Sequence, residues 1–184
     1  QVSDLTFENL IGAIEKLEVI DIRLESKDNP QLIFESLNSC GKDLEEADKV
    51  RNYLLMSLSS KDQEDYYHAY WSKIEKLTDG EPTMFIRDYL RLKKGAISNI
   101  DDLYFDFKSY DMESHIDRQV LLEDMLKFAK YYRQILKGET GNTRLDRKLK
   151  QIANIESLVH LPYLLSFFDY AETNNLNEDE RYKV

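Results

Sequence analysis

The sequence has a single cysteine, Cys40, and no long apolar run. One thiol excludes an internal disulfide and a cysteine-based zinc site, and a free thiol is typical of a reducing compartment, so we expect the protein in the cytoplasm. The densest apolar segment, LVHLPYLLSFF, is shorter than the ~18 residues that suggest a membrane span, and the first residues lack the basic start of a signal peptide. We therefore expect no membrane partner.

Basic residues are outnumbered as well. The chain has 25 Lys and Arg against 35 Asp and Glu, a formal net charge of −10. This charge repels phosphate backbones and anionic lipids at long range, which disfavours a general nucleic-acid or membrane-surface binder. Any contact with DNA must be local or made by another part of the protein. Gln1 and the helix-opening signal from Asn177 to Glu180 indicate a segment of a larger protein.

The remaining pattern is mostly helical, which predicts a mainly α fold. We expect a multi-helix bundle with a small strand-bearing N-terminal edge, where side chains alternate over residues 17–24. Residues 95–110 are expected to be a connector with one aromatic turn at 103–107. Residues 161–170 are apolar almost all round, which predicts central burial. The predicted helices span about residues 4–16, 29–39, 43–58, 62–77, 82–92, 113–136, 145–152 and 161–170.

One charged side chain interrupts the apolar stripe of the helix predicted at 43–58. On a helical wheel of about 100° per residue with Leu44 at zero, Arg51 falls at about −20°, in the middle of the leucine stripe. An unpaired buried guanidinium costs several kcal/mol, so Arg51 needs a partner, and Asp48 is the nearest candidate. Two interpretations stay open. Arg51 forms an ion pair within its own helix, or it meets an anionic ligand at a cleft together with the Asn52 amide.

The same region carries a specific signature. It is Phe34-Glu35-x-Leu37-Asn38-x-x-Gly41-x-x-Leu44, followed by Asp48-x-Val50-Arg51-Asn52-x-Leu54-Leu55. This string resembles the signature of the N-terminal, ParB/sulfiredoxin-like domain of GmrSD-type modification-dependent restriction proteins. The resemblance extends through Tyr70-Trp71-x-x-Ile74-Glu75 and covers residues 1 to about 95, which leaves residues 96–184 as a helical extension. It implies that Glu35, Asn38, Gly41, Asp48, Arg51 and Asn52 line or brace a ligand site.

The resemblance implies a parent protein that senses or cuts modified foreign DNA with the help of nucleotide hydrolysis, a nucleoside triphosphate and a divalent metal ion. The family's Asp-Gly-Gln-Gln-Arg motif is absent from this chain, where Asp79-Gly80-Glu81 is a helix-ending turn. No His-centred nuclease motif is present either. We therefore expect a helical scaffold segment, without catalytic residues or a cofactor of its own, that braces or lines a catalytic core made by the remainder of its polypeptide. The alternative is a protein–protein interaction module.

Two groups of basic residues are candidate phosphate contacts, although a solvated helix face is the commoner explanation for each. The first group offers the parent protein a local contact with DNA and consists of Arg87, Arg91, Lys93 and Lys94. The second consists of Arg144, Arg147, Lys148 and Lys150. The three histidines are too far apart in sequence to form a metal site on one helix, so we predict no metal ligands.

Overall fold

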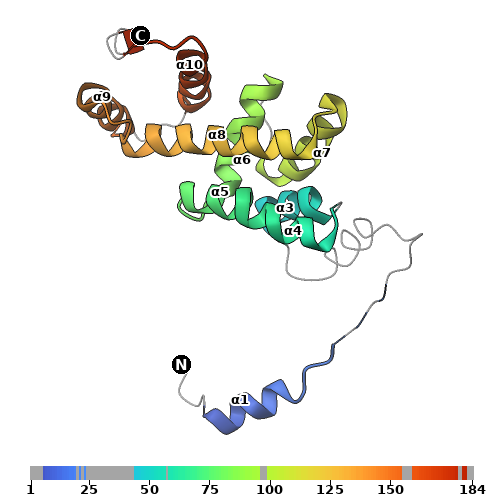
Figure 1. Ribbon diagram of the computed structural model, residues 1–184. Coiled ribbons are helices and arrows are strands. Elements are labelled where there is room, and N and C mark those ends of the chain that lie inside the picture. Colours follow the sequence, from blue (N-terminus) through green and yellow to red (C-terminus); the bar gives the residue numbers. More distant parts are fainter. Residues whose placement is uncertain are drawn as a thin grey trace.

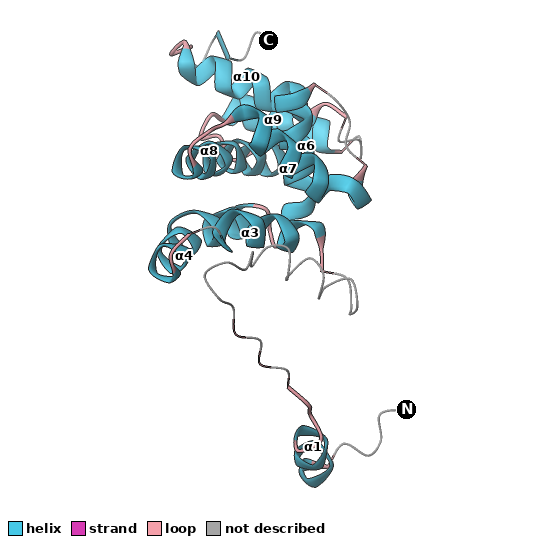
Figure 2. Cartoon of the chain, turned by 90° about the vertical axis from the view of Figure 1, so that its right-hand side faces the viewer, coloured by secondary structure: helices cyan, strands magenta, loops and turns pink. Residues whose placement is uncertain are grey.

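The computed structural model describes residues 6–19, 21, 23, 44–56, 58–95, 99–154, 159–177 and 180–181. Over these residues the fold is an all-helical bundle, as the sequence predicts (Figure 2). None of the described helices combines the length and apolar content needed to cross a membrane. The helices are α1 (Phe7–Ile14), α3 (Glu46–Met56), α4 (Ser60–Tyr66), the π-turn η1 (Tyr67–Trp71), α5 (Ser72–Leu77), α6 (Pro82–Lys94), the 3-10 turn η2 (Ile100–Asp102), α7 (Leu103–Ser114), α8 (Arg118–Lys137), α9 (Thr143–Ala153) and α10 (Leu161–Thr173).

Helix α8 lies in the middle of the bundle, with α3, α4 and α5 on one side and α9 and α10 on the other (Figure 1). It begins where the Asp117 side chain accepts hydrogen bonds from the next backbone N–H groups, and it ends at Gly138 in the left-handed conformation. Side chains from both sides of residue 95 share one core. Its largest fully buried members are Trp71, Tyr89, Phe85, Phe107 and Phe128.

The strand-bearing edge predicted at residues 17–24 is not found in the described part of that segment. Residues 17–19, 21 and 23 have no strand conformation, and no other described residue forms a strand that could pair with them. A lone strand leaves its backbone N–H and C=O groups without partners, so alternating side chains alone do not produce one. Residues 20, 22 and 24–43, which include the helix predicted at 29–39, lie outside the described residues.

Helix α7 corrects the prediction of a connector at residues 95–110. It has 12 residues, and its first turn is capped from another helix, because Glu46 Oε2 accepts a hydrogen bond from the Tyr104 N–H at 2.7 Å. Its buried positions follow the helical period, but its apolar positions do not. Phe105 is 65% exposed, whereas Asp111 is buried. This mismatch between burial and hydrophobicity hid the helix from the sequence pattern.

The structure also corrects the predicted start of the long helix and the predicted burial of residues 161–170. His115 has a φ of 51° and ends α7, so the long helix starts at Arg118 instead of residue 113. The central burial predicted for residues 161–170 is wrong, because α10 lies at the edge of the bundle. Leu165 is fully buried on its inner face, whereas Tyr163 and Tyr170 are exposed on its outer face.

Candidate functional site

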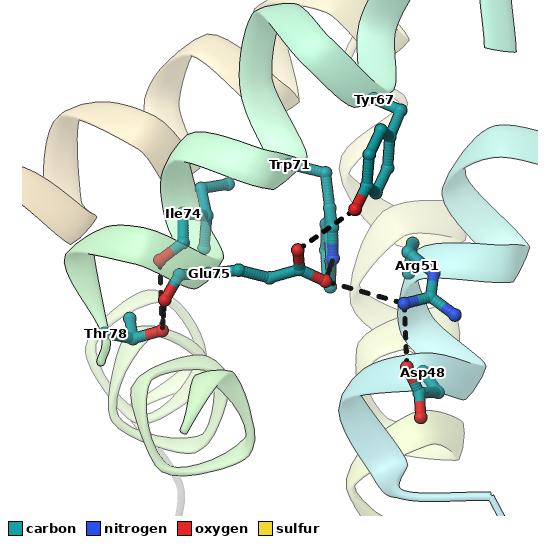
Figure 3. A network of polar contacts seen from close by, with 7 residues as sticks. All are labelled: Asp48, Arg51, Tyr67, Trp71, Ile74, Glu75 and Thr78. Carbon is teal, nitrogen blue, oxygen red and sulfur yellow. Dashed lines mark hydrogen bonds and ion pairs between the residues drawn. The ribbon is translucent and has the colours of Figure 1, made fainter. Parts of the chain in front are cut away.

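The candidate site lies where α3 meets the π-turn η1 and α5 (Figure 3). Arg51 projects from α3 one turn after Asp48, and its Nη1 is 2.8 Å from Asp48 Oδ1. Asp48 sits in the first turn of α3, where the helix dipole favours a negative charge. The structure therefore contains the ion pair that the i, i+3 spacing predicts.

Arg51 has a second carboxylate partner that sequence spacing did not suggest. Its Nη1 lies 3.5 Å from Oε1 of Glu75, which comes from α5. Glu75 is itself held in place, because the Trp71 indole N–H donates to Oε1 at 2.7 Å and the Tyr67 hydroxyl donates to Oε2 at 3.3 Å. Both oxygens of Glu75 are thus occupied, and the network joins α3 to η1 and α5 (Figure 3).

The π-turn brings the two aromatic donors to Glu75. Residues Tyr67–Trp71 have i→i+5 hydrogen bonds, and the Ser72 N–H donates to the Tyr67 carbonyl. Neither proline nor glycine forces this widened turn, and π-turns within helices occur frequently at functional sites. The Trp71 ring is buried in the core while its N–H needs an acceptor, which Glu75 supplies. The resemblance had included Trp71 and Glu75 without giving either a role.

The guanidinium lies at the edge of the core and not in its middle. Arg51 is 27% exposed, which corrects the prediction that the flanking leucines bury it. The predicted stripe left out Val50, which is fully buried with Ala47 and Leu54. The buried residues of α3, which are Ala47, Val50, Leu54 and Leu55, are centred at about −65° on the same wheel, so Arg51 lies about 45° away, on the flank of the buried face.

The side-chain amide of Asn52 is the group of the site that can still form hydrogen bonds with another molecule. Asn52 is half-buried, next to Arg51 in sequence, and its side chain has no hydrogen-bond partner among the described residues. Glu35, Asn38 and Gly41, which share the signature with it, lie outside the described residues. The described half of the signature therefore contains one ion-pair network, whose charges are paired, and one open amide.

The four candidate phosphate contacts, Arg87, Arg91, Lys93 and Lys94, all lie on α6, and three of them form ion pairs with carboxylates. Lys93 Nζ is 2.7 Å from Asp124 Oδ2, and Lys94 Nζ is 3.9 Å from Asp106 Oδ1. Their role as phosphate contacts stays a prediction, and a phosphate would have to compete with these carboxylates.

The two arginines of this group flank a buried carboxylate. Arg87 Nη2 is 3.6 Å from Oδ1 of Asp88, and the charges of Arg87 and Arg91 both favour the ionised carboxylate. Burial outweighs them and raises the pKa of Asp88 above its ordinary value. Asp88 Oδ2 has no hydrogen-bond partner among the described residues.

A second polar cluster on α3 escaped sequence reasoning. The Tyr53 hydroxyl donates to Asp111 Oδ2 at 2.7 Å, and Arg118 Nη2 lies 3.1 Å from the same oxygen. The Arg118 guanidinium also lies over the Tyr53 ring, 5.2 Å from its centroid. These residues come from α3, α7 and α8, so no local spacing could have identified them.

The described residues contain no group of three or more His, Cys, Asp or Glu side chains that could hold a metal ion. Comparison of the chain with known protein families, curated proteins and solved structures gives no match. The resemblance to GmrSD-type proteins therefore rests on the signature alone.

Proposed function

We propose that the chain is a helical scaffold segment of a nucleotide-dependent restriction protein that senses modified DNA. In this proposal the ion-pair network of Arg51, Asp48 and Glu75, which we call the Arg51 corner, braces the catalytic core of that protein. The signature at residues 34–55 supports the family. The network on Arg51 supports the role of a brace, because it ties α3 to α5 through side chains of the chain itself.

The position of Arg51 between two carboxylates carries this proposal. An anionic ligand that approached Arg51 would meet the charges of Asp48 and Glu75, and like charges at short range repel. Glu75 cannot turn aside without losing its hydrogen bonds from Trp71 and Tyr67. In the proposed function Arg51 therefore fixes the corner, while the open amide of Asn52 contacts the neighbouring core.

The experiment compares phage restriction and protein stability for Arg51→Ala, Arg51→Met and Asn52→Ala in the gene that encodes the chain. Phages with modified and with unmodified DNA are plated on each strain. We expect Arg51→Ala to lower both the unfolding midpoint and the restriction of modified phage, and Arg51→Met to lower both less, because its side chain refills the volume. Asn52→Ala should lower restriction without moving the unfolding midpoint.

The control is Lys61→Ala, which changes an exposed side chain of α4 and should leave both measurements unchanged. Equal restriction of modified phage by the wild type, Arg51→Ala and Asn52→Ala would refute the proposal. So would nucleotide hydrolysis by the purified chain that a substitution within it abolishes.

A protein–protein interaction module is the second candidate function. It is favoured by the apolar face of α1, where Phe7, Leu10, Ile11 and Ile14 are all exposed.

A further inference from the structure

A groove between α9 and α10 is open to solvent at the edge of the bundle. It consists of two adjoining cavities of about 210 and 420 Å³. Both cavities are lined by Leu145, Phe167, Phe168 and Arg181, so they form one continuous depression. Its volume and apolar floor are typical of sites that receive an apolar side-chain row from a partner.

The two rims of this groove differ in chemistry. Helix α9 carries four basic residues against the single acid Asp146, and Lys148 lines the groove. Helix α10 contributes the ring of Tyr163, which is 63% exposed. Arg181 lines both cavities, and at the far end Lys130 adds positive charge beside the acid Glu172. A partner that fits this groove therefore presents an apolar row with acidic residues along one side.

Helix α1 has this combination. Phe7, Leu10, Ile11 and Ile14 recur at i, i+3, i+4 and i+7, which places them on one face. Glu8 and Glu15 fall at about 100° and 80° on a wheel with Phe7 at zero, so both acids lie on the same flank of that face. The Thr6 side chain caps the helix by accepting a hydrogen bond from the Asn9 N–H. None of the residues of α1 is buried.

We propose that α1 of a second copy of the chain binds in the groove between α9 and α10, with its acidic flank along the α9 rim. Both views place α1 clear of the bundle, beyond α3 and α4 and on the side away from α9 and α10 (Figures 1 and 2). A neighbouring copy can therefore receive it without the helix passing around its own bundle. The proposal rests on the second candidate function only, since it does not involve the Arg51 corner.

Reciprocal exchange of α1 between two copies buries enough surface for a stable dimer. Four apolar anchors remove about 60–120 Å² each from water, and the groove loses a similar area. Two such sites sum to roughly 1,000–2,000 Å², which is the range of specific protein–protein interfaces. Because each copy gives one helix and receives one, the arrangement closes on itself and does not continue into a filament.

Sedimentation of the full chain and its variants tests the proposal. We expect the wild type to have twice the 21.8 kDa mass of the single chain over the micromolar range. Ile11→Asp places a charge in the apolar row, and Tyr163→Asp places one in the groove, so each should give the monomer mass. Both positions are exposed, so circular dichroism should show the wild-type helix content and unfolding midpoint. Ala13→Asp adds the same charge about 110° from the centre of the apolar row, on the flank away from Glu8 and Glu15, and should leave the dimer intact.

Mixing the two defective variants distinguishes exchange between copies from docking within one chain. The Ile11→Asp chain keeps its groove and the Tyr163→Asp chain keeps its α1, so an equimolar mixture should regain a dimer through one intact site. Monomer mass in every sample, including the wild type, would overturn the proposal. A dimer that persists in Ile11→Asp, or that Ala13→Asp disrupts as strongly, would overturn it as well. None of these outcomes changes the tests of the Arg51 corner.

Discussion

Helix α3 carries two arginine–carboxylate–aromatic clusters, one on each flank, and they differ in burial. We call the cluster of Arg51, Asp48, Glu75, Trp71 and Tyr67 the open corner, and that of Tyr53, Asp111 and Arg118 the closed corner. Glu75 in the open corner is 29% exposed, whereas Asp111 in the closed corner is 8% exposed. Water therefore reaches the carboxylate of the open corner much more than that of the closed corner.

The two corners also differ in how many carboxylates pair with each arginine. Arg51 has two carboxylates, so the loss of one leaves it paired. Asp111 is the shared acceptor for both Tyr53 and Arg118, and Arg118 Nη1 already lacks a partner among the described residues. A buried polar group that loses its partner costs its full desolvation, whereas an exposed one recovers hydrogen bonds from water. The closed corner should therefore contribute more to stability, and the open corner is freer to serve a contact with another part of the protein.

The largest effect is expected for Asp111→Ala. The substitution removes the acceptor of the Tyr53 hydroxyl and the counter-charge of Arg118 at a buried position. We expect a loss of about 3 kcal/mol in the free energy of unfolding. Urea denaturation followed by circular dichroism measures it. A loss below about 1 kcal/mol, in the range of an exposed ion pair, would show that water reaches the closed corner.

A smaller loss is expected for Arg51→Ala in the open corner. Because Arg51 is partly exposed, we expect about 1–2 kcal/mol, between the values for buried and surface ion pairs. Arg51→Met should cost less, since its side chain still covers the edge of the core. The same urea titration compares the two variants. If Arg51→Ala costs as much as Asp111→Ala, the proposed difference between the corners is wrong.

The third effect depends on pH and concerns Tyr53→Phe. Burial, followed by the hydrogen bond to Asp111, raises the pKa of Tyr53 above its ordinary value of 10.0. The folded state thus favours the neutral phenol, so its contribution to stability is complete below pH 10.0 and is lost as the pH rises through the folded-state pKa.

We expect wild type to exceed Tyr53→Phe by about 1 kcal/mol at neutral pH, the usual contribution of one hydrogen bond, and this advantage should shrink above pH 10. Unfolding free energies of both proteins between pH 7 and about pH 11 measure it. Phe keeps the ring beneath Arg118, so the difference isolates the hydroxyl. An advantage that grows with pH would contradict the assignment of Tyr53 as the donor.

Local sequence patterns predicted the features that depend on residues within a single helix. The Asp48–Arg51 pair follows from spacing within α3, and the helical fold follows from the apolar period. Glu75 and Asp111 reach α3 only through tertiary packing, so no local sequence pattern could predict how close they lie to their partners on α3. The strand predicted at residues 17–24 is not found in the described part of that segment, and it too needs a partner from elsewhere in the chain, because a strand is stable only beside another strand.

Burial was harder to predict than helicity. The wheel for α3 omitted the buried Val50 and counted Leu44 and Leu58, which are only half-buried, and it therefore placed Arg51 in the core. For α10 an apolar composition was interpreted as central burial, although its outer face borders the open groove. In both helices apolar side chains occupy more than one face, and only packing decides which face is inside.

The smallest effect is expected for Glu75→Gln, with Asp111→Asn as its matched substitution in the closed corner. Glutamine keeps an oxygen to accept from Trp71, and Arg51 keeps Asp48, so we expect a loss of about 0.5 kcal/mol or less. Asparagine at 111 keeps one acceptor but leaves Arg118, whose Nη1 is buried, without its counter-charge, so its cost should be several times larger. Chemical denaturation at low and high salt measures both substitutions. Added salt should reduce the difference in unfolding free energy between wild type and Glu75→Gln, because exposed charges are screened. It should leave the difference between wild type and Asp111→Asn nearly unchanged. Equal losses with equal salt dependence would mean that burial does not separate the two corners.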